Sequence, residues 1–200
     1  MALDVGHYGE KPGAFSASGR PEFEYNLDLA RETAQDLRNA GLEVRMIGER
    51  GDYRYFNHRT RDAAGAALFV SIHYDSVRSR WIGEADKFSG FSLFVSRRNP
   101  QPEKSLACAS AIGARMRAAG FRPSLYHADP VFGEDRPFAD RENGVHWFDN
   151  LAVAHTATMA AVLIEAGVIV NPVEDAAMRD PAVRASIAQA IATGVRACLR

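Results

Sequence analysis

The sequence predicts an α/β fold, namely a single domain with a mainly parallel, mixed and twisted sheet flanked by helices on both faces. Short apolar runs typical of buried strands alternate along the chain with longer segments whose apolar residues recur at helical spacing. No internal repeat or low-complexity stretch interrupts this alternation. A length of 200 residues, of which 46% are apolar, suits one domain with a sizeable core.

The first quarter of the chain shows this alternation. Residues 2–6 form the first expected strand, and the loop 8–21 that follows is rich in Gly, Ser and Pro. A helix is expected over 24–40, because its apolar residues lie three and four positions apart and a glycine follows it directly. The segment 42–48 alternates apolar and polar residues, which predicts a half-exposed strand at an edge of the sheet.

The middle of the chain continues the pattern. A short helix over 56–65 leads into a buried strand at 67–73, and a further strand is expected at 91–96. The stretch 75–90 between these two strands is polar, and we expect it to be irregular. A helix over 104–119 is closed by a glycine.

The last part of the chain contains the longest segment without a clear pattern. Residues 121–150 include three prolines and many charged residues, and we expect an irregular segment here. Structureless loops of this length in a compact domain are usually functional. A strand at 160–165 and a final helix over 181–199 complete the expected fold.

Charge and hydropathy exclude two classes of partner. The formal net charge is −1, from 24 basic and 25 acidic residues, so nothing favours binding to nucleic acid or to an anionic membrane. No run approaches the roughly 18 consecutive apolar residues that a membrane-spanning helix needs. We therefore expect no nucleic acid partner and no membrane span.

The two cysteines do not form a recognisable framework. Cys108 and Cys198 lie in different expected helices, and neither belongs to a Cys-x-x-Cys motif. We interpret both as small helix residues rather than as a disulfide pair. The chain enters its first strand without a basic or apolar leader, so we expect either a cytoplasmic protein or one whose leader is absent from these 200 residues.

Three of the expected strands end on side chains that can bind metals or transfer protons. His7 follows the first strand, His73 closes the strand at 67–73, and Glu165 closes the strand at 160–165. In open α/β sheets, ligands bind outside the carboxyl ends of the strands. If these strands are parallel neighbours, the three side chains face one crevice. Chance places three such groups in this way much more rarely than one.

Two histidines and a carboxylate are the ligand set of a catalytic zinc site that keeps a fourth position open. The carboxylate has two candidates, Glu22 and Glu24, which lie at the start of the first expected helix. Either could reach back to His7 across the preceding loop. Glu24 also has a simpler interpretation, as a carboxylate that the dipole of the helix N-terminus favours.

Five short blocks, spread in order over most of the chain, carry a family resemblance. They are LDVGHYGEKPGA, GRPEFEYNLDLA, RTRDAA, LFVSIHYD and VLIEAGVIVNP. Together they resemble the zinc-dependent N-acetylmuramoyl-L-alanine amidases of the amidase-3 type, which are cell-wall hydrolases. The resemblance implies that His7, Glu22 and His73 bind Zn²⁺ and that Glu165 is the catalytic residue of a single catalytic domain over residues 1–200.

The reaction implied by the resemblance is hydrolysis of the amide bond between the lactyl group of N-acetylmuramic acid and L-alanine of the stem peptide. Zinc lowers the pKa of a bound water toward about 7 and stabilises the developing oxyanion. Glu165 takes the proton of the attacking water and delivers it to the leaving amine. The sequence departs from the family pattern after His73, because Asp75 stands where asparagine is commoner, which changes the rim of the site.

The resemblance also implies partners and a location. The substrate is peptidoglycan or a soluble muropeptide, the protein is a monomer, and it acts in the cell envelope, in the periplasm or after secretion. Some relatives carry an inserted helix that blocks the zinc until an activator binds. Glycines and prolines in residues 76–90 and 127–150 oppose such a helix, so we expect an open site and no obligatory activator.

Two other functions remain open on the sequence alone. One is another zinc-dependent peptidase or amidohydrolase on a similar scaffold. The other is a non-catalytic wall-binding relic. Glu165 argues against the relic, because a binding module has no chemical need for this carboxylate.

Several side chains outside the ligand set have structural interpretations. We expect Arg59 to form a structural ion pair and Asp4 to orient the histidine that follows its strand. His127 and His146 are interpreted as surface or hydrogen-bonding histidines. His146 and Trp147 also form an aromatic pair in the long segment that could contact sugar or peptide.

Overall fold

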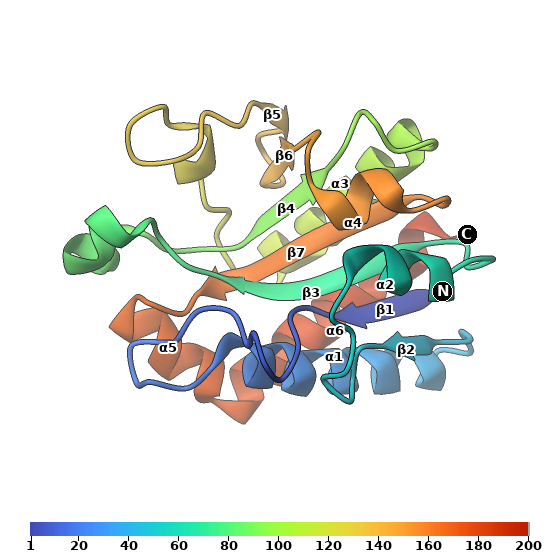
Figure 1. Cartoon of the computed structure of the whole chain (residues 1–200), viewed down its shortest axis with the longest axis horizontal. Coiled ribbons are helices and arrows are strands. Elements are labelled where there is room, and N and C mark those ends of the chain that lie inside the picture. Colours follow the sequence, from blue (N-terminus) through green and yellow to red (C-terminus); the bar gives the residue numbers. More distant parts are fainter. Residues whose placement is uncertain (200) are drawn as a thin grey trace.

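The computed structural model describes residues 1–199 and contains a seven-stranded sheet with helices packed on both faces (Figure 1). This confirms the predicted α/β class. The strands are β1 (Ala2–Val5), β2 (Arg45–Ile47), β3 (Phe69–Asp75), β4 (Ser92–Val95), β5 (Phe138–Asp140), β6 (Val145–Trp147) and β7 (Ala161–Val168). The helices are α1 (Glu22–Asn39), α2 (Phe56–Asp62), α3 (Pro102–Ala118), α4 (Ala152–Thr156), α5 (Pro172–Arg179) and α6 (Pro181–Cys198). Short 3₁₀ segments are η1 (Ser79–Lys87) and η2 (Tyr126–Ala128).

The strand order places the three strands that carry the expected site residues side by side. The order is β2-β1-β3-β7-β4-β6-β5, with β2 at an edge as its alternating pattern predicts. β2, β1, β3 and β7 run parallel, and β4 runs antiparallel to β7. β6 is parallel to β4, and β5 pairs antiparallel with β6 at the other edge. The carboxyl ends of β1, β3 and β7 therefore meet at one end of the sheet.

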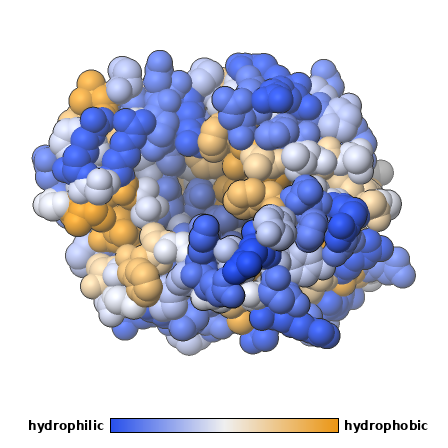
Figure 2. Space-filling view, viewed as in Figure 1, coloured by the Kyte–Doolittle hydropathy of each residue, from blue (hydrophilic) through white to orange (hydrophobic). Residues whose placement is uncertain are grey.

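Helices cover the two faces of the sheet unequally. One face packs against α1, α3 and α6, and its core includes Leu3, Val70 and Ile164. The other face has a smaller core around Phe69 and Leu163 beneath the short helices α2 and α4. Figure 1 shows α2 and α4 in front of the sheet, toward the amino end of β3. Figure 2, in the same view, shows the middle of this face hollowed.

Helix α1 begins two residues earlier than its apolar spacing predicts. The spacing begins the helix at residue 24, whereas the structure begins it at Glu22, directly after Pro21. Its buried face carries Tyr25 and Leu29, which pack into the larger core. The earlier start matters because Glu22 thereby becomes a buried residue of the first helical turn.

The segment 121–150 is not irregular throughout, so this prediction is wrong in part. It contains η2, β5 and β6, and the structure adds α4 and α5, which the sequence did not indicate. β5 and β6 have three residues each, too few to show a periodicity. β6 is stabilised by pairing with β4, a strand about 50 residues earlier in the sequence, so the local sequence pattern does not reveal it.

The interpretation of the cysteines as unpaired residues is wrong. Cys108 in α3 and Cys198 in α6 form a disulfide, with their Cα atoms 5.0 Å apart. The two residues are 90 positions apart in the sequence, and packing of α3 against α6 brings them together. Spacing motifs do not reveal a pair of this kind, because its geometry depends on helix packing.

Within residues 1–199, every helix is too short or too polar to cross a membrane.

Candidate active site

His73 and Glu165 lie on the face of the sheet that α2 and α4 only partly cover. Side chains alternate along a strand, so His73 shares its face with Phe69, and Glu165 shares its face with Leu163. His73 and Glu165 are register partners across β3 and β7. His7 follows β1 directly, so all three predicted residues lie at the same end of the sheet.

Glu22 lies between the two histidines. His7 Nε2 is 2.9 Å from Glu22 Oε2, and His73 Nδ1 is 3.1 Å from Glu22 Oε1. One donor atom from each residue lies within 4.8 Å of the others, so His7, Glu22 and His73 form a group that can hold a metal ion; we call it the metal triad. Glu24 instead pairs with Arg20 at 3.0 Å on the surface.

Backbone and amide donors fix the orientation of the Glu22 carboxylate. The N–H of Ala14 donates to Oε2 at 3.1 Å, and the N–H of Tyr74 donates to Oε1 at 3.3 Å. The Asn26 amide, one helical turn further along α1, donates to Oε1 at 3.3 Å and to the Gly6 carbonyl at 3.2 Å. The loop after β1, the start of α1 and the end of β3 thus all position one buried carboxylate.

The charge of Glu22 is stabilised by the two histidines. Burial by itself raises the pKa of this carboxyl group, but the hydrogen bonds and charges of His7 and His73 outweigh burial and lower the pKa to about 2. The group is therefore ionised at neutral pH, as a metal ligand must be.

Two glycines leave the space that the triad needs. A Cβ added at Gly6 would lie 2.3 Å from the imidazole ring of His73. A Cβ added at Gly13 would lie 2.3 Å from Glu22 Oε2 and 2.7 Å from the His7 ring. Since real Cβ atoms essentially never approach this closely, side chains at these positions would displace the triad.

Arg59 holds the backbone of His7, which has a positive φ of 67° that is unusual for a residue with a side chain. The buried guanidinium donates to the carbonyls of Val5 and His7 and pairs with Asp4 at 2.7 Å. Arg59 is thus a structural ion-pair residue. Ser71 donates to the other oxygen of Asp4 at 2.7 Å. The prediction that Asp4 orients the His7 ring directly is therefore wrong, because Asp4 acts through Arg59.

Glu165 has the environment of a carboxyl group with high proton affinity. Burial, followed by the negative charges of Asp75 and Glu22, raises its pKa well above the usual range. Its Oε2 atom is buried and has no hydrogen-bond partner among the described residues. Glu165 therefore retains an unused acceptor beside the metal triad.

A second charged group lies beside Glu165, and the sequence only hinted at it. His127 Nε2–H donates to Asp75 Oδ2 at 2.7 Å, and His127 Nδ1–H donates to Glu134 Oε2 at 2.7 Å. We call these three residues the His127 bridge. Tyr126 also donates its hydroxyl hydrogen to Asp75. Burial opposes the charge of His127, but the two carboxylates outweigh it and raise the pKa to about 9. In the sequence, the only hint of this bridge was Asp75, which departs from the family pattern.

The pair His146 and Trp147 does not form one contact surface. His146 is fully buried, and burial lowers its pKa to about 4, so its ring is neutral. Only Trp147 is partly exposed, with the Arg97 guanidinium over its ring. His146 is thus a hydrogen-bonding residue, as one interpretation predicted. The prediction that it contacts sugar or peptide is wrong, because its ring is buried.

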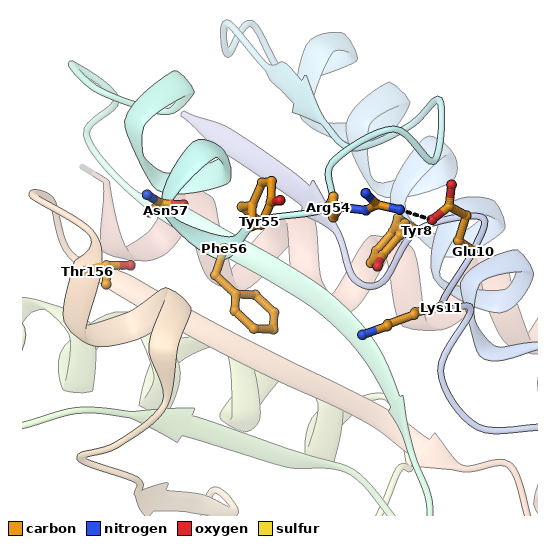
Figure 3. Close-up of a pocket in the computed structure, with 8 residues that line it drawn as sticks. All are labelled: Tyr8, Glu10, Lys11, Arg54, Tyr55, Phe56, Asn57 and Thr156. Atoms are coloured by element: carbon orange, nitrogen blue, oxygen red, sulfur yellow. Dashed lines mark hydrogen bonds and ion pairs between the residues drawn. The ribbon is translucent and has the colours of Figure 1, made fainter.

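A groove of about 620 Å³ begins at Tyr8, the residue after His7 (Figure 3). Tyr55 and Phe56, at the start of α2, form one wall and are 57% and 61% exposed. Lys11 extends into the groove from the loop after β1. The groove therefore runs from the residue next to a member of the metal triad to exposed aromatic surface.

Comparison with known proteins shows that this chain is similar to cell-wall amidases. AmiC, an N-acetylmuramoyl-L-alanine amidase of Neisseria meningitidis serogroup B, is 28% identical over 220 residues, covering 98% of this chain and 51% of AmiC. The probable cell wall amidase LytH of Staphylococcus aureus is 26% identical, covering 98% of this chain and 57% of LytH. The chain spans about half the length of these curated relatives.

The fold and the family agree with these relatives. The crystal structure of the N-acetylmuramyl-L-alanine amidase Ami1 from Mycobacterium smegmatis matches with a TM-score of 0.81 at 21% identity, covering 99% of this chain and 95% of that one. This likeness shows a shared fold. The family model described as N-acetylmuramoyl-L-alanine amidase, Amidase_3, matches residues 1–197. The chain therefore belongs to the Amidase_3 family of N-acetylmuramoyl-L-alanine amidases.

Proposed function

We propose that this chain hydrolyses the amide bond between the lactyl group of N-acetylmuramic acid and L-alanine of the stem peptide in peptidoglycan, with Zn²⁺ as cofactor. The observation that carries the proposal is the convergence of His7, Glu22 and His73 beside Glu165 in a chain of this family. Residues 1–200 act as one catalytic domain in this proposal.

The metal triad would hold the zinc ion. Imidazole nitrogen and carboxylate oxygen suit Zn²⁺, and three protein ligands leave one position open. The donor atoms lie within 4.8 Å of one another, and Glu22 is ionised. These observations support the fit between the triad and zinc. When bound, the ion supplies Lewis acidity, which activates water and stabilises negative charge on the carbonyl oxygen.

Glu165 is the residue proposed to move the proton. It accepts a proton from the water that attacks the lactyl carbonyl carbon, and it donates that proton to the leaving amine of L-alanine. The raised pKa supports the second half of this role, in which the group holds the proton before donating it, and a bound dication would lower the pKa for the first half. Its unpartnered Oε2 leaves an acceptor available for the attacking water.

The groove in Figure 3 supports a polymeric substrate. It lies open at the surface, begins beside His7 and carries the exposed rings of Tyr55 and Phe56. Exposed aromatic side chains provide flat apolar contact area at small entropic cost. We assign the groove to the part of the peptidoglycan that extends away from the scissile bond.

We further propose that the protein acts in the cell envelope as a monomer. Peptidoglycan lies outside the cytoplasm, and the disulfide between Cys108 and Cys198 is a bond that persists in oxidising compartments. Both observations favour the cell envelope over the cytoplasm.

The proposal includes no activator. η1 is a 3₁₀ segment with a kink at Glu84, and its Trp81 packs on Phe132 with ring centroids 4.9 Å apart. Figure 1 shows residues 79–87, in green, at the left edge of the molecule beyond the carboxyl end of β3. This segment is too short and too irregular to resemble an inserted amphipathic plug.

Metal analysis combined with digestion of purified sacculi tests the proposed function. We expect one zinc per chain after extensive dialysis, together with release of stem peptides that begin with a free L-alanine amino group. Cleavage within the stem peptide, with the muramoyl–alanine bond intact, would favour a zinc peptidase. Binding to sacculi without cleavage would favour a wall-binding relic.

A further inference from the structure

Arg136 lies on the same face of the sheet as Glu165, and its guanidinium packs against two aromatic rings. Its guanidinium carbon is 3.4 Å from the ring centroid of Phe148 and 5.1 Å from that of Phe94. Burial lowers the pKa of Arg136 and outweighs the nearby negative charges of Glu134, Asp75 and Glu165, which raise it. The group therefore lies close enough to the proposed proton-transfer residue to feel its charge.

The backbone of Arg136 is fixed at both polar atoms. Its N–H donates to the His127 carbonyl at 2.8 Å, and its carbonyl accepts from His146 Nδ1 at 3.3 Å. The preceding residue, Asp135, has a φ of 53°, and within residues 1–199 only His7 shares this property among residues other than glycine. Such conformations persist only where the surrounding structure enforces them. The His127 bridge anchors this turn to the end of β3.

The guanidinium of Arg136 has only one weak polar partner among the described residues. In the described part of the chain, no hydrogen bond has a guanidinium nitrogen of Arg136 as donor, and its one ion pair is Nε to Glu134 Oε2 at 3.5 Å. By contrast, Arg59 donates to a carboxylate and three carbonyls. A side chain that is 21% exposed, stacked and still without hydrogen bonds is an arrangement that requires an explanation.

The ion pairs around Arg136 leave its guanidinium available to an anionic ligand. Glu134, the carboxylate paired with it at 3.5 Å, is already bound to His127 at 2.7 Å and lies 3.9 Å from Arg78. A guanidinium presents a rigid fork of donors that matches a carboxylate in a bidentate pair. Because its backbone and its ring contacts are already fixed, little entropy is lost when such a ligand binds.

We propose that Arg136 binds a carboxylate of the stem peptide and thereby selects acidic stem peptides as substrates. This inference rests on the proposed function, which makes the stem peptide the leaving group. Arg136 is here a binding residue, and the His127 bridge positions it. The peptide carboxylate pairs with the unused donors of the guanidinium while Phe148 and Phe94 keep the group in place.

The test compares soluble muropeptides in which each stem-peptide carboxylate is replaced, one at a time, by a carboxamide. At the position that contacts Arg136, we expect replacement of the carboxylate by a carboxamide to lower kcat/KM of the wild-type protein by about 10- to 100-fold. This is the range of a charge-assisted hydrogen bond. The loss should appear mainly in KM, because binding of a remote carboxylate acts on substrate and transition state alike.

Variants link this selectivity to Arg136. Arg136→Met should hydrolyse the acid and the amide at similar rates, both near the wild-type rate on the amide. Arg136→Lys, which keeps the charge without the fork, should restore part of the preference. Arg97→Met is the matched control, since Arg97 also stacks on an aromatic ring but pairs with Asp149 at 2.9 Å, and its preference should remain that of the wild type.

The outcomes separate this proposal from the proposed function. If the wild-type protein hydrolyses the acidic peptide and all its amides equally well, the carboxylate site is wrong while the amidase activity stands. If it hydrolyses no muropeptide, the proposed function fails and this site fails with it. Should Arg136→Met not fold, the wild-type comparison and Arg136→Lys still decide the question.

Discussion

The metal triad and the His127 bridge lie at the same end of the sheet and use the same residue types, but they are built in opposite ways. In the triad, two histidines share the carboxylate of Glu22. In the bridge, one histidine, His127, lies between two carboxylates. The side chains of His7 and His73 are 32% and 15% exposed, whereas that of His127 is 5% exposed.

The ratio of histidines to carboxylates determines whether each group can bind a metal ion. With two imidazoles and one carboxylate, nitrogen lone pairs remain available to a cation once the hydrogens are lost. In the bridge, both nitrogens of His127 carry hydrogens that are already donated, so the ring has no lone pair for a metal. Of these two clusters, the metal triad is therefore the candidate metal site and the His127 bridge is not.

The largest difference between the metal triad and the His127 bridge should appear in the zinc content of their variants. His73→Ala should abolish tight zinc binding and with it the activity, because it removes one of three ligands. Glu22→Gln should also lose most of the metal, since a neutral amide replaces the buried carboxylate between the histidines. Metal analysis after dialysis measures both.

Two controls accompany these variants. Glu24→Gln changes a surface carboxylate paired with Arg20, and His127→Ala removes the bridge histidine; both should retain one zinc per chain. Unchanged zinc in His73→Ala, or greater loss in Glu24→Gln than in Glu22→Gln, would show that the ligand assignment is wrong.

The next largest effect concerns Glu165. Glu165→Gln should keep the fold and the zinc but lower turnover by roughly 10²- to 10⁴-fold, the usual cost of losing a general base. Turnover on a soluble muropeptide and zinc content should be measured on the same sample. Near wild-type turnover would remove Glu165 from the mechanism, and loss of zinc would mean that it is a ligand.

A smaller effect should appear in the stability of the metal-free protein. The folded state raises the pKa of His127 from 6.5 to about 9, so it binds this proton more tightly than the unfolded chain does. The resulting stabilisation is complete below pH 6.5 and is lost as the pH rises through about 9. Denaturant unfolding at several pH values should show this decline, with Asp75, Glu134, Tyr126 and Arg136 as the groups facing the ring.

His127→Gln supplies the comparison for that experiment. The variant should be less stable than the wild type at pH 6, and the difference should shrink toward pH 9. A difference that stays constant over this range would mean that His127 contributes packing rather than charge.

The smallest expected effect is on access to the site. Deleting residues 78–88 removes η1 together with Arg78, which lies 3.9 Å from Glu134 at the edge of the His127 bridge. The rate on soluble muropeptide should stay the same or fall somewhat. A rise of tenfold or more, about 1.4 kcal/mol in the barrier, would identify the segment as an inhibitor and contradict the open site.

Local patterns in the sequence predicted the central strands, the long helices and the end of the sheet at which the candidate site lies. Strand periodicity and helical spacing are local properties, and they indicated β1, β3, β7 and the major helices. Parallel strands end at the same edge of a sheet, so histidines and a glutamate at three such ends were expected to meet, and the structure places them together. The family resemblance then selected Glu22 over Glu24 before any geometry was known.

Contacts between segments that are remote in sequence could not be predicted, because they depend on how the helices and strands pack. The disulfide depends on packing of α3 against α6, and β5 and β6 depend on pairing with β4. The same holds for the His127 bridge, which joins Asp75 to residues 52 and 59 positions further along the chain. Arg136 could not be distinguished from other arginines in the sequence, because its stacked position and unused donors arise only from the packing of the long segment onto the sheet.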